Sequence, residues 1–358
     1  MEHSITMYIN AYSTVRDEIP GPFAHNRGAG DPEMAEHLQG FTGFVWERGG
    51  QEMTSHMFGL IRHIGETQRQ YVFERDSIDG LGDWARDANA VFLLPDGRVV
   101  NAAGEDIIAG GQVPYHPAAA ERAQRVRAGI TKDTGASVPA HYPPVRSEFE
   151  AAVRAPREVA QRFMALVAVS ELASHLLGGQ HPPLEGLRAV LPDAFSAWTP
   201  QEARFVELLE SGDVDVEAGF LDEGGVAKHN AATQEAAELA FQLQWSAAAA
   251  VLLSHVLQLQ RIPDDEILVH PGPTVQWVAE NGQDAVYAHA GELIALPELC
   301  DKYEFVRSLR WITVDDRLHP ERPATLDEPT AGALLEWHRA LSWLFTPGTG
   351  WDEVDLST

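Results

Sequence analysis

The sequence contains a single cysteine, Cys300, among 358 residues. One thiol cannot form a disulfide within the chain, and such a scarcity is typical of a reducing compartment. The N-terminus lacks a basic segment followed by an apolar one, so it does not indicate a signal peptide. The most apolar helical stretch, residues 245–257, is too short and too polar to cross a bilayer of about 30 Å. We therefore expect a soluble cytoplasmic protein that does not insert into a membrane.

Basic residues are also scarce. The chain has 26 Lys and Arg against 53 Asp and Glu, which gives a formal net charge of −27. Residues 201–300 hold 17 of the acids and 3 of the bases, so −14 of the charge lies there. Such a surface repels phosphate backbones and disfavours nucleic acid as a partner. A basic partner or a cation is compatible with it, although a need for solubility alone also accounts for the charge.

Catalytic and cofactor motifs are missing as well. The chain has no His-Glu-x-x-His, Cys-x-x-Cys or Gly-x-Ser-x-Gly. His63 with Glu66, and Glu171 with His175, each place two metal-binding groups on one face of a predicted helix. A metal site needs three or four ligands, and neither pair is completed. The sequence therefore predicts no metal and no cofactor, and it favours a protein that is not an enzyme without deciding the question.

The first 112 residues are expected to form a small α/β domain. Apolar and polar residues alternate over 5–12, as in a strand. Asp31-Pro32 is a helix start, and a second helix is predicted over 53–64. The apolar residues that share one face of the first helix are Met34, Leu38, Phe41 and Val45. Further strands are predicted at 70–74 and 90–94, the latter followed by a turn at 95–97.

A connector and a helical domain follow. Residues 113–146 are interrupted by prolines and glycines, and within them only 118–127 has a helical pattern. Residues 147–358 are predicted to form an α-helical domain, so the fold class is α+β. Thr199-Pro-Gln-Glu202 is a capping box that begins one of its helices.

The sequence pattern predicts a definite element for some other parts of the helical domain and leaves alternatives for others. Residues 231–259 are expected to form one long apolar helix, and the last two helices to lie near 296–318 and 328–345. Residues 212–229 are acidic and rich in glycine, which predicts an exposed loop. The pattern of residues 270–290 leaves strand and loop open.

Three stretches of the helical part are distinctive together. They are residues 154–166, residues 311–318, and residues 337–343 followed by the tail 351–358. In this order they resemble the bacterial family called domain of unknown function 4272, over residues 130–358. Ser342 stands where that pattern has asparagine, and Arg307 is one residue from the expected arginine. The resemblance implies a helical fold, and it implies no activity because the family has none established.

Polar side chains on apolar helix faces form the candidate site. A projection at 100° per residue places His338 on the core face of its helix, and Arg162 among apolar residues of another. A buried guanidinium needs a carboxylate, which Asp315 or Asp316 would supply. With Arg317, a cluster of Arg162, Asp315, Arg317 and His338 is expected. It is interpreted as a network that fixes helix packing or, alternatively, as a pocket for a ligand or for acid–base work.

Two functions remain in view. The first is a non-catalytic cytoplasmic module that binds an unidentified partner protein. The alternative is an enzyme or small-ligand binder with a polar site between the helices. The sequence leaves the oligomeric state open.

The end of the chain carries one further expectation. Trp343 lies opposite the core stripe of the last helix, and a turn at 347–350 precedes Trp351. We expect the tail to fold back, so that Trp351 contacts the helical domain and Trp343 is buried.

Overall fold

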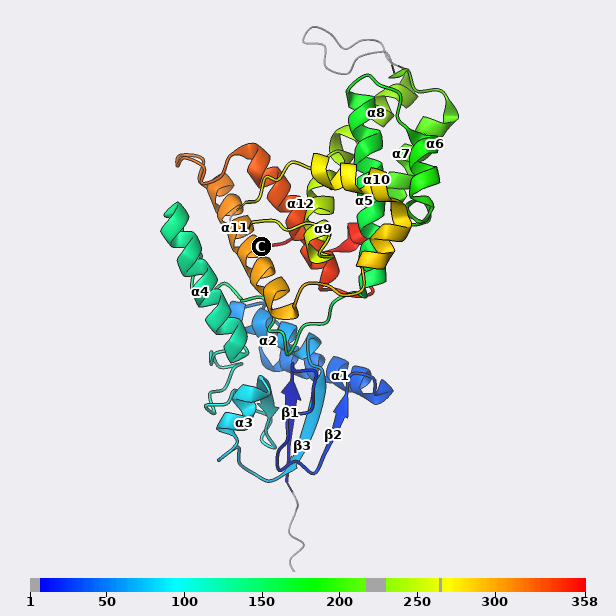
Figure 1. The fold of residues 1–358 in the computed structure, drawn as a ribbon. Coiled ribbons are helices and arrows are strands. Elements are labelled where there is room, and N and C mark those ends of the chain that lie inside the picture. Colours follow the sequence, from blue (N-terminus) through cyan, green and yellow to red (C-terminus); the bar gives the residue numbers. More distant parts are fainter. Residues whose placement is uncertain (1–6, 217–229, 264–265) are drawn as a thin grey trace, which may run out of the picture. The chain divides into compact units, whose positions relative to one another are not determined.

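The computed structural model describes residues 7–216, 230–263 and 266–358 (Figure 1). Two compact units divide the chain. The N-terminal unit contains the residues up to 125 together with 142–151, and the helical unit contains 126–141 and 152–358. The predicted connector, 113–146, thus contributes residues to both units. The fold class is α+β as predicted, with a small antiparallel sheet region before a mostly helical one.

A five-stranded antiparallel sheet forms the N-terminal unit, in the order β2-β3-β1-β4-β5. The central strand β1 (Tyr8–Ser13) pairs with β3 (Arg69–Glu74), where Ile9 lies opposite Phe73. Its other neighbour is β4 (Ala90–Leu93). The edge strands are β2 (His25–Gly28) and β5 (Val99–Val100). Three strands predicted from alternation and apolar runs are thereby confirmed; Ile5, assigned to the first, lies outside the described residues.

Each face of this sheet is covered by helix. Helices α1 (Pro32–Arg48) and α2 (Ser55–Gly65) pack on the face that holds Tyr12, and the short α3 (Gly82–Asp87) packs its Trp84 on the other. The predicted stripe of α1 is confirmed, because Met34, Phe41 and Val45 are buried and Leu38 packs against the same core.

A buried carboxylate ties residues 142–151 to the sheet. Glu150 accepts hydrogen bonds from the Thr14 hydroxyl at 2.5 Å and from the Asn89 amide at 2.9 Å. Its other oxygen accepts from the Ser147 hydroxyl at 2.7 Å and the Ser147 N–H at 2.8 Å. Burial alone would raise the pKa of Glu150, but these donors stabilise the anion more strongly, so the pKa lies below its usual value.

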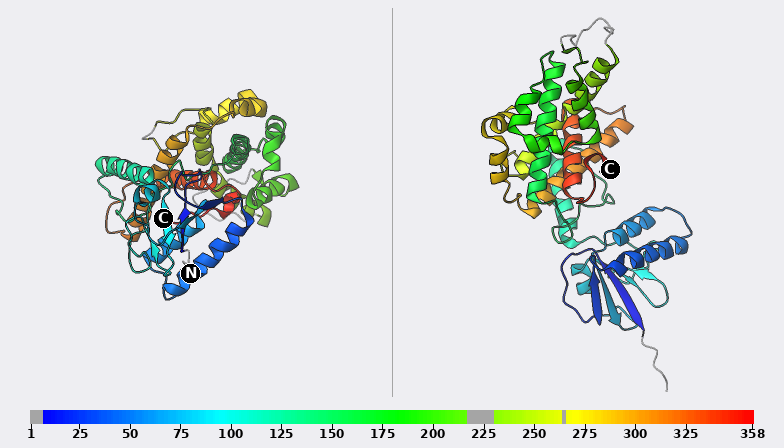
Figure 2. Two further views of the ribbon diagram at one scale, coloured as in Figure 1. Left: turned by 90° about the horizontal axis from the view of Figure 1, so that it is seen from below. Right: turned by 90° about the vertical axis from the view of Figure 1, so that its right-hand side faces the viewer.

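Helix α5 (Pro156–Leu177) is central to the helical unit (Figure 2). Fourteen of its 22 residues are buried, which explains why its sequence is apolar almost all round. It packs against α8 (Ala231–Leu243), α9 (Ser246–Val256), α10 (Gly272–His289) and the 3₁₀ turn η1 (Pro192–Ser196). The other elements of this unit are α6 (Leu184–Val190), α7 (Pro200–Ser211), α11 (Leu296–Leu318), α12 (Glu328–Leu344) and the 3₁₀ turn η3 (Trp351–Glu353). Helix α4 (Pro117–Thr134) contributes residues to both units.

Three helix predictions need correction. The single helix expected over 231–259 is two, because the chain breaks between α8 and α9 at Gln244 and Trp245. Residues 270–290, left between strand and loop, form α10, which is interrupted at Gly282, where φ is +71°. Glycine adopts that left-handed conformation without a Cβ clash. Helix α4 extends well beyond the expected 118–127.

The stretch Ala231–Val256 has the length and hydropathy of a membrane span. However, 61% of its most apolar window is buried inside the protein, as in an ordinary core helix, so it is weak evidence for a membrane. Within the loop predicted at 212–229, residues 217–229 lie outside the described residues.

Candidate functional site

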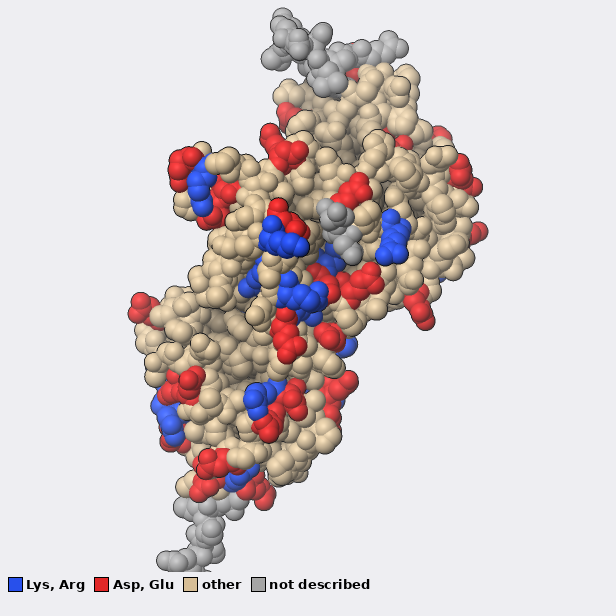
Figure 3. Space-filling model, turned by 60° about the vertical axis from the view of Figure 1, so that its left-hand side comes forward, with Lys and Arg blue, Asp and Glu red and all other residues tan. Residues whose placement is uncertain are grey.

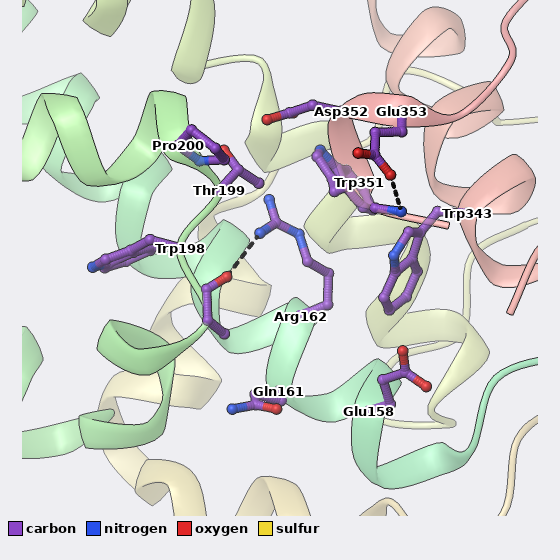
Figure 4. A pocket seen from close by; sticks show the side chains of 12 residues that line it. Glu158, Gln161, Arg162, Trp198, Thr199, Pro200, Trp343, Trp351, Asp352 and Glu353 are labelled. Carbon is purple, nitrogen blue, oxygen red and sulfur yellow. Dashed lines mark hydrogen bonds between the residues drawn. The ribbon is translucent and has the colours of Figure 1, made fainter. Parts of the chain in front are cut away.

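Two adjoining cavities lie where α5, α7, α12 and η3 meet. The first, lobe A, has a volume of about 360 Å³ and is bounded by Arg162, Trp343 and Glu158 among others (Figure 4). The second, lobe B, has about 330 Å³ and reaches Trp245 and Arg339. The residues that line both lobes are Thr199, Trp351 and Asp352. We therefore describe the two lobes as one cleft around Trp351.

A buried ion pair lies beside this cleft. The two terminal nitrogens of Arg162 donate to the two carboxylate oxygens of Glu202, one of them at 2.9 Å. Their side chains are only 5% and 2% exposed. Glu202 also accepts from the Thr199 N–H at 2.9 Å, which completes the predicted capping box of α7. One carboxylate thus begins a helix and neutralises the buried guanidinium.

Two tryptophans that line lobe A contact each other, and each also stacks against one arginine. The Cζ atom of Arg154 lies 4.2 Å from the ring centre of Trp343, and that of Arg162 lies 4.4 Å from the ring centre of Trp351. The two indoles meet edge to face, with ring centres 5.5 Å apart. Both are at least nine-tenths buried. The expectation that the tail folds back and covers Trp343 is confirmed.

Arg154 also holds the turn that brings the tail back. Its Nε donates to the Trp343 carbonyl at 2.7 Å, and its Nη2 donates to the carbonyl of Thr346 at 2.9 Å and to that of Thr349. Its remaining nitrogen pairs with Glu158. Because most of these acceptors are backbone carbonyls, the turn is fixed largely independently of its side chains.

Lobe B contains a carboxyl group in an apolar setting. Burial raises the pKa of Glu336 above its usual value, and the nearby Arg339, 3.4 Å away, opposes this only in part. Trp245 forms another wall, and it approaches α12 closely because Gly332 has no side chain to obstruct the ring. A carboxyl with a raised pKa beside a cavity is a feature common at functional sites.

The cleft is aromatic and acidic. Among the described residues that line its two lobes, five are carboxylates and two are guanidiniums, a formal charge of −3. The carboxylates are Glu158, Glu202, Glu336, Asp352 and Glu353. Four tryptophans also line it: Trp198, Trp245, Trp343 and Trp351. Acidic side chains are likewise spread over the molecular face drawn in Figure 3.

The sequence profile described as "Domain of unknown function (DUF4272)" matches residues 122–354. The chain belongs to this family. The match confirms the resemblance read from the three stretches of the helical part, and it includes both arginines and both tryptophans of the stack. No curated protein and no solved structure matches the chain significantly.

The four residues of the predicted cluster are placed differently in this DUF4272 member. Arg162 lies in the cleft as a buried cation, but its carboxylate partner is Glu202 instead of Asp315 or Asp316. Asp315 pairs with Arg322 at 2.8 Å and with His319 at 3.2 Å. Arg317 is exposed. The apolar stripes gave the buried face of α5 correctly, but they carry no information on which helix end lies opposite.

His338 is buried on α12, as expected from its helical face, and does not line the cleft. Its Nδ1 has no hydrogen-bond partner among the described residues. Burial, together with the positive charges of Arg307 and Arg310, lowers its pKa to about 3. His338 is therefore a neutral core histidine at ordinary pH.

The predicted two-residue metal pairs serve other contacts. Within 7–216, 230–263 and 266–358, no group of three or more His, Cys, Asp or Glu is arranged to hold a metal ion. His63 contacts the Tyr12 carbonyl at 3.1 Å, while Glu66 pairs with Arg62 at 3.0 Å. The His175 ring contacts a backbone carbonyl of its own helix at 2.9 Å. Cys300 is buried.

The sequence analysis did not place Glu202, Glu336, Trp198 or Trp245 in a site. Glu202 had a signal, because the capping box marks it, but a capping glutamate is usually exposed. Glu336 had none, since it only adjoins the core stripe of α12.

Proposed function

We propose that the helical unit is a non-catalytic, cytoplasmic binding module, and that the cleft around Trp351 receives a ligand group the size of one side chain or small metabolite. The observation that carries this proposal is the cleft itself. Each lobe has the volume typical of a small ligand site, and its walls combine indole rings with a few polar groups. The ligand is either a free molecule or a side chain of a partner protein.

The pairing of charges in the cleft supports binding over catalysis. Arg162 is held by Glu202, Arg154 by Glu158 and Arg339 by Glu336. Arginines and carboxylates that are paired in this way fix the shape of the cleft wall. They do not provide a nucleophile with an adjacent general base, which covalent catalysis needs.

Asp352 offers a way to test the proposal. It is exposed and lines both lobes, so Asp352→Tyr narrows the cleft without altering the core. Asp284→Tyr, on an exposed site of α10 outside the cleft, is the matched control. Wild type and the control, purified from the native cell, should retain a compound or protein in native mass spectrometry that Asp352→Tyr loses. Identical retention by all three would contradict the proposal.

A second candidate, acid–base catalysis, is supported by Glu336. A carboxyl group with a raised pKa at a cavity wall keeps its proton to higher pH than an ordinary glutamate does, so it is suited to act as a proton donor. If this function holds, wild type should deplete a component of a metabolite extract, and Glu336→Gln should not. An extract left unchanged by wild type would exclude it.

A further inference from the structure

We infer that lobe A binds an organic cation, with an alkylammonium or guanidinium head group placed against the indole rings and the carboxylates at its rim. This inference rests on the proposed binding function and names the chemistry of its ligand.

The tryptophans supply the first argument. Indole rings attract cations through the negative potential of their faces. In this protein Trp343 and Trp351 already hold the guanidinium groups of Arg154 and Arg162, at 4.2 and 4.4 Å. Figure 4 shows both rings on the same side of Arg162 in the cavity wall. Both rings line lobe A, together with Trp198.

The charges of the wall supply the second argument. The charge of Arg162 is offset by Glu202, and that of Arg154 by Glu158. Asp352 and Glu353 remain at the rim, both exposed, and the Glu353 carboxylate accepts a hydrogen bond from the Gly350 N–H at 3.0 Å. A cation entering lobe A therefore meets two carboxylates that form no ion pair with any described residue, whereas an anion would be repelled.

Arg162 does not oppose this assignment. Its guanidinium is 5% exposed and bound through two hydrogen bonds to a carboxylate, so its field in the cavity is largely cancelled. Its Nε is buried and has no hydrogen-bond partner within the part of the chain that the structure describes. A ligand that carries a hydrogen-bond acceptor beside its cationic head would accept from the Nε–H of Arg162 if the cavity wall moved to admit it.

Choline and its uncharged isostere 3,3-dimethylbutan-1-ol provide a direct test. They have nearly the same shape and differ in charge, so calorimetric titration of the full chain isolates the contribution of the cation. We expect choline to bind and the alcohol to bind at least about tenfold more weakly, in line with a desolvated cation–π contact. Equal affinities would overturn the cation assignment but leave the binding proposal standing.

A matched pair of double variants locates the effect. Asp352→Asn with Glu353→Gln removes the two rim charges, and Asp284→Asn with Glu280→Gln removes two exposed acids on α10 outside the cleft. The first should weaken choline binding about tenfold and leave the alcohol unaffected, whereas the second should change neither. An equal loss in both double variants would overturn the inference, because it would reflect net charge alone.

The source of the cation is distinguished by two further probes, butylammonium and N-acetyl-lysine methylamide. Tighter binding of the blocked lysine supports a partner protein as the source, and tighter binding of butylammonium supports a free amine. Absence of binding by choline and by both amines would overturn the inference. The retention experiment with Asp352→Tyr would then still decide whether the cleft binds any ligand.

Discussion

The guanidinium of Arg162 lies against the indole face of Trp351, with 4.4 Å between Cζ and the ring centre. Arg162 belongs to the central helix α5, and Trp351 to the tail that follows the last helix. This contact holds the tail against the helical unit, and its Trp351 is part of the wall shared by the two lobes. Stability and the candidate site therefore depend on the same few side chains.

Truncation should show how much the tail contributes. Removing residues 350–358 exposes Trp343 and leaves Arg162 without its aromatic neighbour, so the free energy of unfolding should fall by clearly more than the roughly 0.5 kcal/mol of a surface change. Trp351→Ala alone should cost about 3 kcal/mol, because a nearly buried indole is lost. Urea denaturation measures both. Removal of residues 357–358 is the control and should have little effect; equal stability of all the proteins would show that the tail is dispensable.

The Arg162–Glu202 pair should be asymmetric. Glu202→Gln leaves a buried guanidinium without its counter-charge and should cost roughly 3–5 kcal/mol. Arg162→Met should cost less, since Glu202 keeps its hydrogen bond from the Thr199 N–H. The double variant should recover part of the loss, which a double-mutant cycle in urea measures directly.

The same helix provides a matched control for that cycle. Arg204 on α7 also forms two hydrogen bonds to one carboxylate, Glu235, at 2.7 and 2.8 Å, but both side chains are largely exposed. Its coupling should be much smaller because water screens it. Similar coupling in the two pairs would mean that burial does not set the strength of the cleft pair.

Some of this arrangement follows from the sequence and some does not. Helical projection predicted the burial of Arg162 and His338, because each depends only on a periodic face. The burial of Trp343 was predicted from the turn at 347–350 and the apolar Trp351 that follows it. The partner of Arg162 depends on which helix end lies opposite, and sequence spacing does not contain that. Helix α10 was missed because Pro271, Gly272 and Pro273 suggest a loop, yet they occupy its N-terminus, where such residues are tolerated.

Glu150 should anchor residues 142–151 to the sheet of the N-terminal unit. In Glu150→Gln an amide N–H₂ replaces one carboxylate oxygen, either the one that accepts from Thr14 and Asn89 or the one that accepts from Ser147. Because a donor then faces donors, the free energy of unfolding should fall by about 2–4 kcal/mol. The folded pKa of Glu150 is lowered, so its contribution is present above the unfolded pKa and disappears as pH falls through the folded value. Thermal melts of Glu150→Gln, with the exposed Glu52→Gln as control, test this; equal melting temperatures would refute the anchor.

The last prediction concerns acid. The pKa of His338 is lowered from an ordinary 6.5 to about 3 by burial and by Arg307 and Arg310. The unfolded chain therefore binds a proton below pH 6.5 that the folded protein refuses until about pH 3, and stability falls as pH falls through that window. By pH 5 the free energy of unfolding should have fallen by about 2 kcal/mol because of His338, since each pH unit below 6.5 contributes about 1.36 kcal/mol.

Substitution separates this histidine from the other titrating groups. His338→Leu should remove that part of the pH dependence, so the difference in melting temperature between pH 7 and pH 5 should be smaller than in wild type. His181→Gln, an exposed histidine of the helical unit, should keep the wild-type difference. If His338→Leu and wild type lose the same stability between pH 7 and pH 5, then His338 takes up its proton without opposing the fold, and the buried neutral state assigned to it is wrong.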